Sequence, residues 1–536
     1  MRTNRSPAFI ILLVTVVLGC GGERSDSAVK SADGDDRAGG VAVFCALNTP
    51  DALNPFASPD EAAADLVPAL YTPLVLYDSV GGFKPHLARS WTWSPDSRTL
   101  QFILRSDVRW HDGKPVTPGD VVWTIKAAAD SAYPYPGRAE FADVVSVSAA
   151  DSMVELRFAK PFAAGLEPFS RLPVLPQHLL DSVPAARFAQ SSYHREPIGS
   201  GPFRYAGRLP DGSVKLDRFA DYPEELGRAR LNRIVLREVP EPPAILVELQ
   251  SGSADVCTVG SSIAADAQKA GSQILPVAPV GTLILAVDHR KAPFNDVRLR
   301  RALSAALNRA EIASVISQAA VPARTFLPSE ARRWTDPRLL QPDHDLAAAN
   351  ALLDSAGWRA GAADGIRRNG SGSRLRFTIT APAPLQRVLP VIQAHLRQAG
   401  IDVQLRLMEG SAFFGLLGDP ARRPEAVAVI FNPDRIAVPN AYELLHSTGS
   451  MNISSYQRAA ADSLLDRLQT AVPDEERGRL YHAMQQYVAT DIPVIYVVHT
   501  PRMLAVKSRL RDVHVDINGP FGHAAQWWIP AAERNR

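Results

Sequence analysis

The stretch that decides the fold is built from three linked segments, LARSW at Leu87–Trp91, WHDGKP at Trp110–Pro115 and DVVW at Asp120–Trp123. Between the first two, Leu100–Arg105 alternates apolar and polar residues, which predicts a half-buried strand. Asp112-Gly113 is a turn signal, because glycine adopts a positive φ without strain. Thr117 and Pro118 then predict a helix start, with a capping hydroxyl followed by a proline at the first helical position. The block therefore indicates a scaffold of strand, tight turn and helix.

The composition describes a large, nearly neutral globular protein. The chain has 536 residues, enough for two or three domains, and 46% of them are hydrophobic, which supplies material for large cores. It contains 58 Lys and Arg against 56 Asp and Glu, and two of the basic residues, Arg2 and Arg5, precede residue 20. Near-neutrality of the remaining chain argues against nucleic acid or an anionic membrane surface as the main partner.

The N-terminus has the three-part order of an export signal. Two basic residues are followed by the apolar run Ala8–Leu18, which is short for a membrane span. Val17–Cys20 resembles a bacterial lipobox, which implies a signal peptide at 1–19 and acylation of Cys20, for example by palmitate. An ordinary cleaved signal followed by a chance cysteine is the alternative. The segment 20–40 is rich in Gly, Ser, Asp and Ala, which predicts a flexible tether.

Predicted strands and helices alternate along the rest of the chain, which favours an α/β fold. The first strand is Val41–Cys45, and Ala62–Leu70 is the first predicted helix. Gly281–Val287 is a candidate crossover strand, because a second series of helices and strands begins after it. Near the end of that series, Val494–Val498 is predicted to be a strand that returns toward the first unit.

The block also resembles the family 5 extracellular solute-binding proteins of ABC transporters, the relatives of dipeptide-, oligopeptide- and nickel-binding proteins. In that family an LNP motif, an LA-x-SW motif, a strand and a W-x-DG-x-P motif follow one another, as they do here after Asp51–Pro55. The resemblance continues in three later motifs, PIGSGPF at Pro197–Phe203, FNDVRLRRAL at Phe294–Leu303 and ANALLDSAGW at Ala349–Trp358.

This resemblance implies the α/β fold of the type II periplasmic-binding proteins, with two lobes joined by a hinge and a ligand cleft between them. The expected lobe I comprises 41–287 and 500–536, and it includes a subdomain at about 78–200. The expected lobe II comprises 288–499.

The resemblance also implies ligand-binding residues. Val427–Asp434 resembles the family's strand that ends in an aromatic residue and an aspartate. Phe431 then stands in for the aromatic residue, and Asp434 for the carboxylate that receives the α-ammonium of a bound peptide. A solvated aspartate in a loop after Pro433 is the alternative. Directly afterwards Ala437-Val438-Pro439 departs from the family's pattern, which leaves peptide specificity open.

Three further residues complete the expected site. Arg387 follows a strand and loop in a place that resembles the arginine pairing with a peptide carboxylate, although this chain is several residues shorter there. Asn48 and Thr49 follow the first strand, where groups commonly face the cleft.

Cys45 and Cys257 are the two cysteines that remain after Cys20. In an oxidising compartment such a pair favours a disulfide. Dipeptide-binding relatives carry a disulfide at corresponding places, which supports the same pairing. Two buried free thiols are the alternative.

Motifs for catalysis are missing from the sequence. There is no Gly-x-Ser-x-Gly elbow, Walker loop, His-Glu-x-x-His or Cys-x-x-Cys. His111-Asp112 is a pair suited to proton transfer, but neighbours on an extended chain point to opposite faces, which favours a hairpin role. The twelve histidines show no metal-ligand spacing, so we expect no metal, no cofactor and no enzyme.

We therefore expect a lipid-anchored, monomeric receptor outside the cytoplasmic membrane, facing the periplasm or the cell exterior. It would capture a short peptide or a similar small solute in the cleft and deliver it to an ABC permease. Relatives also bind nickel complexes and sugars, and the sequence leaves these open. The rival interpretations are a ligand-sensing receptor of the same fold and an extracytoplasmic hydrolase.

Overall fold

The computed structural model describes residues 36–534, apart from 48, 51, 55, 57–60, 79–81, 163–164, 318, 328–330, 332–333, 362–363, 420, 432–440 and 471–473. The predicted signal peptide, Cys20, most of the tether, Asn48 and Asp434 lie outside the described residues. Within the described part, no helix is long and apolar enough to cross a membrane.

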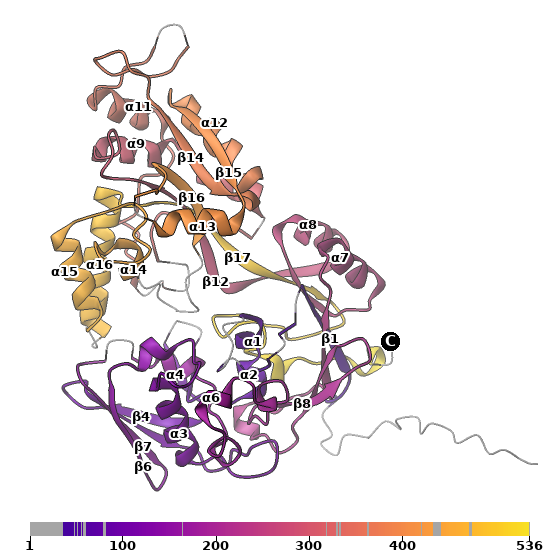
Figure 1. Cartoon of the computed structure of the whole chain (residues 1–536). Helices are drawn as coiled ribbons and strands as arrows, with labels where there is room; N and C mark the ends of the chain where they lie inside the picture. Colours follow the sequence, from indigo (N-terminus) through magenta and orange to yellow (C-terminus); the bar gives the residue numbers. More distant parts are fainter. Residues whose placement is uncertain are drawn as a thin grey trace, which may run out of the picture.

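Among the described residues, one eleven-stranded sheet runs from the upper part of the molecule to the part at the right of Figure 1. Its strands follow the order β15-β14-β16-β12-β17-β11-β1-β10-β9-β8, and β13 pairs with β17 beside this path. They are β1 (Val41–Ala46), β8 (Phe203–Arg208), β9 (Val214–Arg218), β10 (Arg233–Glu238), β11 (Val256–Val259), β12 (Ser272–Val287), β13 (Val321–Pro322), β14 (Arg376–Pro382), β15 (Asp402–Met408), β16 (Ala426–Phe431) and β17 (Ile495–Lys507). We call the part built on β1 and β8–β11 lobe I, and the part built on β14–β16 lobe II.

Two long antiparallel strands, β12 and β17, connect the lobes (Figure 1). β12 pairs with β16 of lobe II over Thr282–Val287, and β17 pairs with β11 of lobe I over Met503–Val506. Register shifts between Val277 and Val280, and between Leu283 and Ile284, interrupt the ladder of β12 with β17. Such irregularities bend a strand locally, so the connection has two natural bending points.

The predicted scaffold forms a separate four-stranded sheet with the order β4-β5-β7-β6. Its strands are β4 (Ala88–Trp93), β5 (Thr99–Leu104), β6 (Val144–Ala150) and β7 (Met153–Phe158), and a small sheet pairs β2 (Val75–Tyr77) with β3 (Phe83–Pro85). The predicted strand is confirmed as β5, and the turn is confirmed by a φ of +88° at Gly113. The predicted helix start is also confirmed, because Thr117 and Asp120 cap each other's backbone N–H at the start of α3 (Pro118–Ala129).

Sixteen α-helices surround the sheets in the described residues: α1 (Glu61–Asp65), α2 (Val67–Leu70), α3, α4 (Glu167–Arg171), α5 (Gln177–Leu180), α6 (Ala185–Phe188), α7 (Pro242–Ser251), α8 (Ser261–Lys269), α9 (Val297–Ala306), α10 (Arg309–Ile316), α11 (Leu346–Ser355), α12 (Leu389–Gln398), α13 (Gly410–Gly418), α14 (Ala441–Leu445), α15 (Ala459–Leu468) and α16 (Asp474–Asp491). The predicted helical segment Ala62–Leu70 is confirmed, but it divides at Leu66 into the two short helices α1 and α2. Pro68 explains the division, because it has no N–H to donate to the preceding turn.

Two of the family-like motifs pack directly on each other. The N–H groups of Ser200 and Gly201 both donate to the carbonyl of Leu70, each at 3.0 Å. A Cβ on Gly199 would lie 1.8 Å from that same carbonyl oxygen, so this position requires glycine. His111 is buried beside them and bonds to the backbone of Gly199 and Gly201. These motifs therefore hold lobe I together.

Buried apolar side chains form one large core in each lobe, a smaller cluster around Cys45 and Cys257 in lobe I, and a further cluster that bridges the lobes. The lobe I core is drawn from residues 42–277 and 504–529, and the lobe II core from residues 283–498. In the bridging cluster, Tyr77 and Ile517 join residues of lobe II such as Val429. The lobe boundaries expected from the sequence stay a prediction.

His111 makes stability depend on pH. Its Nδ1 accepts from the Gly199 N–H, so the proton lies on Nε2, which faces the Gly201 carbonyl, and both distances are 3.1 Å. Burial lowers the pKa of His111 from 6.5 to about 4. Between pH 6.5 and 4, His111 is therefore mostly protonated in the unfolded chain and mostly neutral in the folded chain. The stability from neutral His111 is present above pH 6.5 and is lost as the pH falls through 4.

We expect the free energy of unfolding to decrease between pH 6.5 and 4.5, as measured by urea denaturation. In H111Q, whose amide can make both backbone bonds, the decrease should be smaller by about 1.4 kcal/mol per pH unit, the value for one proton. The exposed His344 provides the control, since H344Q should behave as the unmodified chain. An H111Q variant with an unchanged pH dependence would contradict this role.

Candidate functional site

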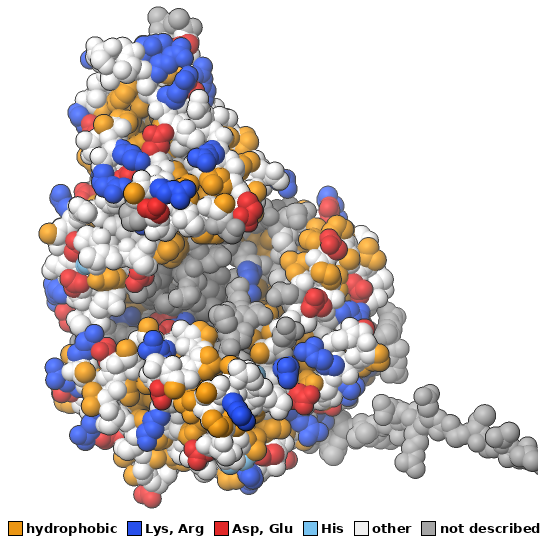
Figure 2. Space-filling model, viewed as in Figure 1, with side chains coloured by type: hydrophobic (Ala, Val, Ile, Leu, Met, Phe, Trp, Pro, Cys, Tyr) orange, Lys and Arg blue, Asp and Glu red, His pale blue; other side chains and the backbone are white. Residues whose placement is uncertain are grey.

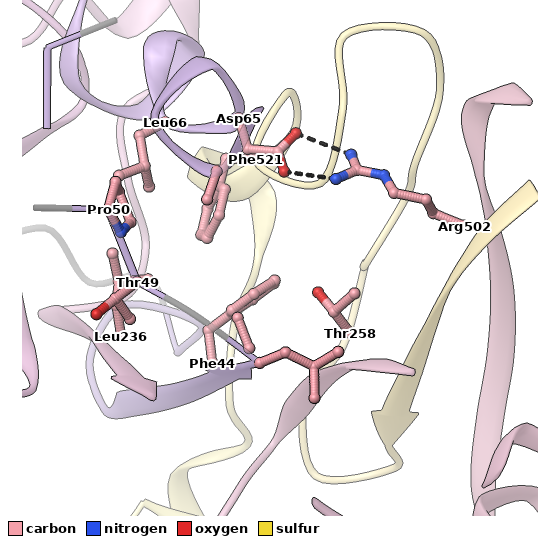
Figure 3. A pocket seen from close by; sticks show the side chains of 12 residues that line it. Phe44, Thr49, Pro50, Asp65, Leu66, Leu236, Thr258, Arg502 and Phe521 are labelled. Carbon is pink, nitrogen blue, oxygen red and sulfur yellow. Dashed lines mark hydrogen bonds and ion pairs between the residues drawn. The ribbon is translucent and has the colours of Figure 1, made fainter. Parts of the chain in front are cut away.

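A cavity of about 280 Å³ lies in lobe I at the carboxyl ends of parallel strands (Figure 3). β1 lies between β10 and β11 and is parallel to both. Ligands of open α/β sheets bind in the crevice outside the carboxyl ends of such parallel strands. The wall contains Phe44, Thr49, Asp65, Leu236, Thr258 and Phe521, among others. This cavity is therefore the candidate ligand site of lobe I.

An ion pair between Asp65 and Arg502 forms one wall of the cavity. Asp65 ends α1, and Arg502 reaches it from β17 (Figure 3). Both terminal nitrogens of Arg502 donate to the carboxylate, each at 3.0 Å. The side chains are 10% exposed for Asp65 and 28% for Arg502. Because a two-bonded pair fixes the orientation of both groups, it ties the first helix to a hinge strand.

Thr49 lies in the wall of the same cavity. Its backbone N–H and its hydroxyl both donate to one carboxylate oxygen of Glu238, each at 3.0 Å. Glu238 ends β10, so these bonds hold the segment after β1 against the neighbouring strand. The structure thus places Thr49 where the sequence predicted a ligand contact, and the contact itself stays a prediction.

Phe431 and Arg387 lie at the corresponding edge of lobe II, away from the residues that line the lobe I cavity. β14 runs parallel to β15 and β16, and Phe431 is the last residue of β16. Arg387 ends the 3-10 helix η6 (Ala383–Arg387), which directly follows β14, and its side chain is exposed. Each lobe therefore presents the carboxyl ends of parallel strands, and Figure 2 shows a hollow between the lobes.

β12 links these two positions. Phe431 lies opposite Thr282, and Arg502 lies opposite Val277 on the same strand. Five residues of strand at roughly 3.3 Å each give at most about 16 Å between the two residue pairs, because the register shift between Val277 and Val280 lies within this stretch. The hydroxyl of Thr282 also forms a hydrogen bond with Nδ1 of His499 at 2.9 Å. This bond joins β12 to β17 at the position where Phe431 pairs with β12. An extended chain of about five residues covers this span.

Sequence reasoning missed Asp65 and Arg502. Asp65 lies inside a predicted helix, and Arg502 lies four residues beyond Val498, where the predicted strand ended. The apolar run Met503–Val506 was the available signal, because it continues the strand beyond Pro501. That extension places Arg502 within the hinge, although it does not reveal the partner.

Cys45 and Cys257 are both buried, free thiols, so the predicted disulfide is not formed in this structure. They lie opposite each other on the adjacent parallel strands β1 and β11. A hydrogen bond with Cys45, together with burial, raises the pKa of the Cys257 thiol. Neighbouring strands lie roughly 4.8 Å apart, a spacing that is compatible with a disulfide.

The pair considered for proton transfer is separated by the fold. Asp112 contacts Nε2 of His178 at 2.7 Å, whereas His111 points into the core and bonds to backbone groups. In the described part of the chain, no group of three or more His, Cys, Asp or Glu is arranged to hold a metal ion.

Comparison with known proteins identifies a family. The model of the bacterial extracellular solute-binding proteins, family 5 middle region, matches residues 82–449. The oligopeptide-binding protein AppA of Bacillus subtilis (strain 168) is 24% identical over 546 residues, which cover 98% of this chain and 99% of AppA.

Solved structures show the same fold. AppA from Bacillus subtilis in complex with a nonapeptide has a TM-score of 0.69 at 23% identity, and covers 92% of this chain and 99% of its own. The substrate-binding protein CtaP from Listeria monocytogenes has a TM-score of 0.80 at 22% identity, with coverages of 92% and 100%. NikZ from Campylobacter jejuni in complex with Ni(L-His) has a TM-score of 0.70 at 21% identity, with coverages of 91% and 99%. The chain thus has the type II fold of periplasmic solute-binding proteins, as the sequence predicted.

Proposed function

This chain belongs to the bacterial extracellular solute-binding proteins of family 5, and we propose that the solute it binds is a short peptide. Proteins of this kind are the substrate-binding components of ABC importers, so the chain binds its solute outside the cytoplasmic membrane for import. In the proposed mechanism the peptide lies between the lobes, the lobes close around it, and the permease recognises the closed form.

One observation carries the choice of a peptide. Arg502, which lines the lobe I cavity, and Phe431 at the edge of lobe II pair with residues five positions apart on β12, a stretch of at most about 16 Å that leaves room for an extended peptide. AppA, whose solved complex holds a nonapeptide, is a relative with this capacity.

The expected chemistry at the peptide ends supports the same choice. Asp434 follows Phe431 by three residues, and an aspartate there suits the α-ammonium of a peptide. Arg387 lies exposed at the same edge of lobe II, where a guanidinium suits a carboxylate. Asn48 and Thr49 would contact the peptide from lobe I.

The role of Asp434 is tested by isothermal titration calorimetry with the peptide Ala-Phe-Ala-Ala-Ala and its N-acetylated form. We expect the free amine to bind at least roughly tenfold more tightly, because hydrogen bonds to charged groups contribute about 1.5–3 kcal/mol. In D434A both peptides should bind equally and weakly. Glu475, an exposed lobe II carboxylate, provides the matched control, and E475A should retain the difference. Retained discrimination in D434A would contradict the assignment.

We also propose that Cys20 carries the lipid that holds the receptor at the membrane surface. In its own host the mature protein should fractionate with membranes, and its mass should exceed that of the polypeptide beginning at Cys20 by the acyl groups. C20S should appear in the soluble extracytoplasmic fraction with unchanged peptide affinity. A wild-type mass without added lipid would leave an ordinary cleaved signal as the explanation.

A disulfide between Cys45 and Cys257 is proposed for the exported protein, because the two thiols are adjacent and the compartment is oxidising. Mass spectrometry of the non-reduced protein should then find no free thiol among these two cysteines. Adding a reductant should lower the free energy of unfolding by about 2–4 kcal/mol. The double variant C45A/C257A should not respond to the reductant. Two alkylatable thiols in the native exported protein would disprove the bridge.

A further inference from the structure

We infer that the lobe I cavity is a subsite for one bulky apolar side chain of the bound peptide, and that the Asp65–Arg502 ion pair makes it reject charged side chains. The inference rests on the proposed peptide function and adds a sequence preference to it. Phe, Leu or a similar residue is the class of side chain that the cavity takes.

The surfaces that face the cavity are apolar over most of the wall. Phe44, Leu66, Leu236 and Phe521 are all buried, and in Figure 3 their side chains surround one space. They come from β1, from the turn before α2, from β10 and from the C-terminal segment, respectively. Four separated parts of the chain thus converge on one apolar pocket. Such a pocket gains free energy when it exchanges water for an apolar group.

The size of the cavity suits a side chain and not a whole peptide. Pockets that enclose drug-sized ligands have volumes of roughly 300–1,000 Å³. The cavity, at about 280 Å³, lies at the lower limit of that range. In the proposed complex one side chain enters the cavity, and the rest of the peptide lies outside it, toward the edge of lobe II that contains Phe431.

Among the described residues that line the cavity, Arg502 and Asp65 carry charges, and they pair with each other. Arg502 directs both terminal nitrogens to the carboxylate of Asp65. A charged side chain that enters the cavity would lose its hydration in a mostly apolar space where Arg502 and Asp65 already pair with each other, and such desolvation is costly. An aromatic or branched aliphatic side chain carries no charge, so it enters the cavity without this desolvation cost. The ion pair thus confers selectivity while it holds α1 against β17.

The test is a positional scan by isothermal titration calorimetry with pentaalanine peptides. Each peptide has free termini and carries a single Phe, Asp or Lys at one of the five positions. At one position Phe should increase affinity roughly tenfold or more over Ala, since burial of such a side chain contributes about 1.5–3 kcal/mol. Asp and Lys at that position should give no increase.

Filling the cavity should remove this preference. Thr258 contributes a small side chain to the wall from β11, so T258F should reduce the Phe advantage to less than twofold while alanine peptides still bind. Thr92 lies exposed on β4, and T92F provides the control with the same substitution at a distant strand. The control should retain the full advantage.

Breaking the ion pair should redirect the preference in a way that a merely structural role would not. D65N leaves the guanidinium of Arg502 without this carboxylate, so the Asp peptide should gain at least fivefold at the Phe-preferring position. R502M should favour the Lys peptide instead. Thermal melting before titration shows whether each variant is folded, and if either is unfolded, T258F alone decides whether the subsite exists.

The outcomes separate the two proposals. If no peptide binds the unmodified protein, the proposed function is wrong, and the proposed subsite is wrong as well. If peptides bind but Phe gives no advantage at any position, or if T258F retains that advantage, the function stands and the subsite is overturned.

Discussion

The antiparallel pairing of β12 with β17 is the constraint on which the rest of the structure depends. These strands enter the sheets of both lobes, so their ladder fixes where one lobe core lies relative to the other. Arg502 and the row of Phe431 are both attached to this ladder. The register shifts lie between those two positions and just beyond the row of Phe431, and bending between them changes the distance that separates them. The hinge is therefore built into the same strands that carry both halves of the site.

Local patterns predicted the scaffold well. β5 follows from strict alternation, and α3 follows from the Thr117 cap with the adjacent proline, because both depend on neighbouring residues. The PIGSGPF motif was recognisable as a family signature, but its physical reason is visible only in three dimensions. Gly199 approaches the carbonyl of Leu70 so closely that no side chain fits. A sequence pattern identified the glycine, and the packing explains it.

Contacts between distant residues could not be predicted in this way. Asp65 and Arg502 are 437 residues apart, and nothing in the sequence around either residue specifies the other. The same limit applies to the strands that contain proline. The predicted strand ended at Val498, although the structure continues it through Pro501 to Lys507 as β17, across an irregular part of the ladder. Phe431, Thr49 and Arg387 were placed from family resemblance, and the fold puts them at strand ends in two different lobes.

Affinity and lobe closure make different demands on a ligand. A ligand shifts the equilibrium between open and closed lobes only by its difference in affinity for the two forms, about 1.4 kcal/mol for each tenfold change. A group that fills only the lobe I cavity makes the same contacts in both forms, so it binds without favouring closure. A longer ligand that also reaches the edge of Phe431 gains contacts only when the lobes approach. The apolar cavity would then supply affinity, while the far end of the peptide would drive the closure that the permease recognises.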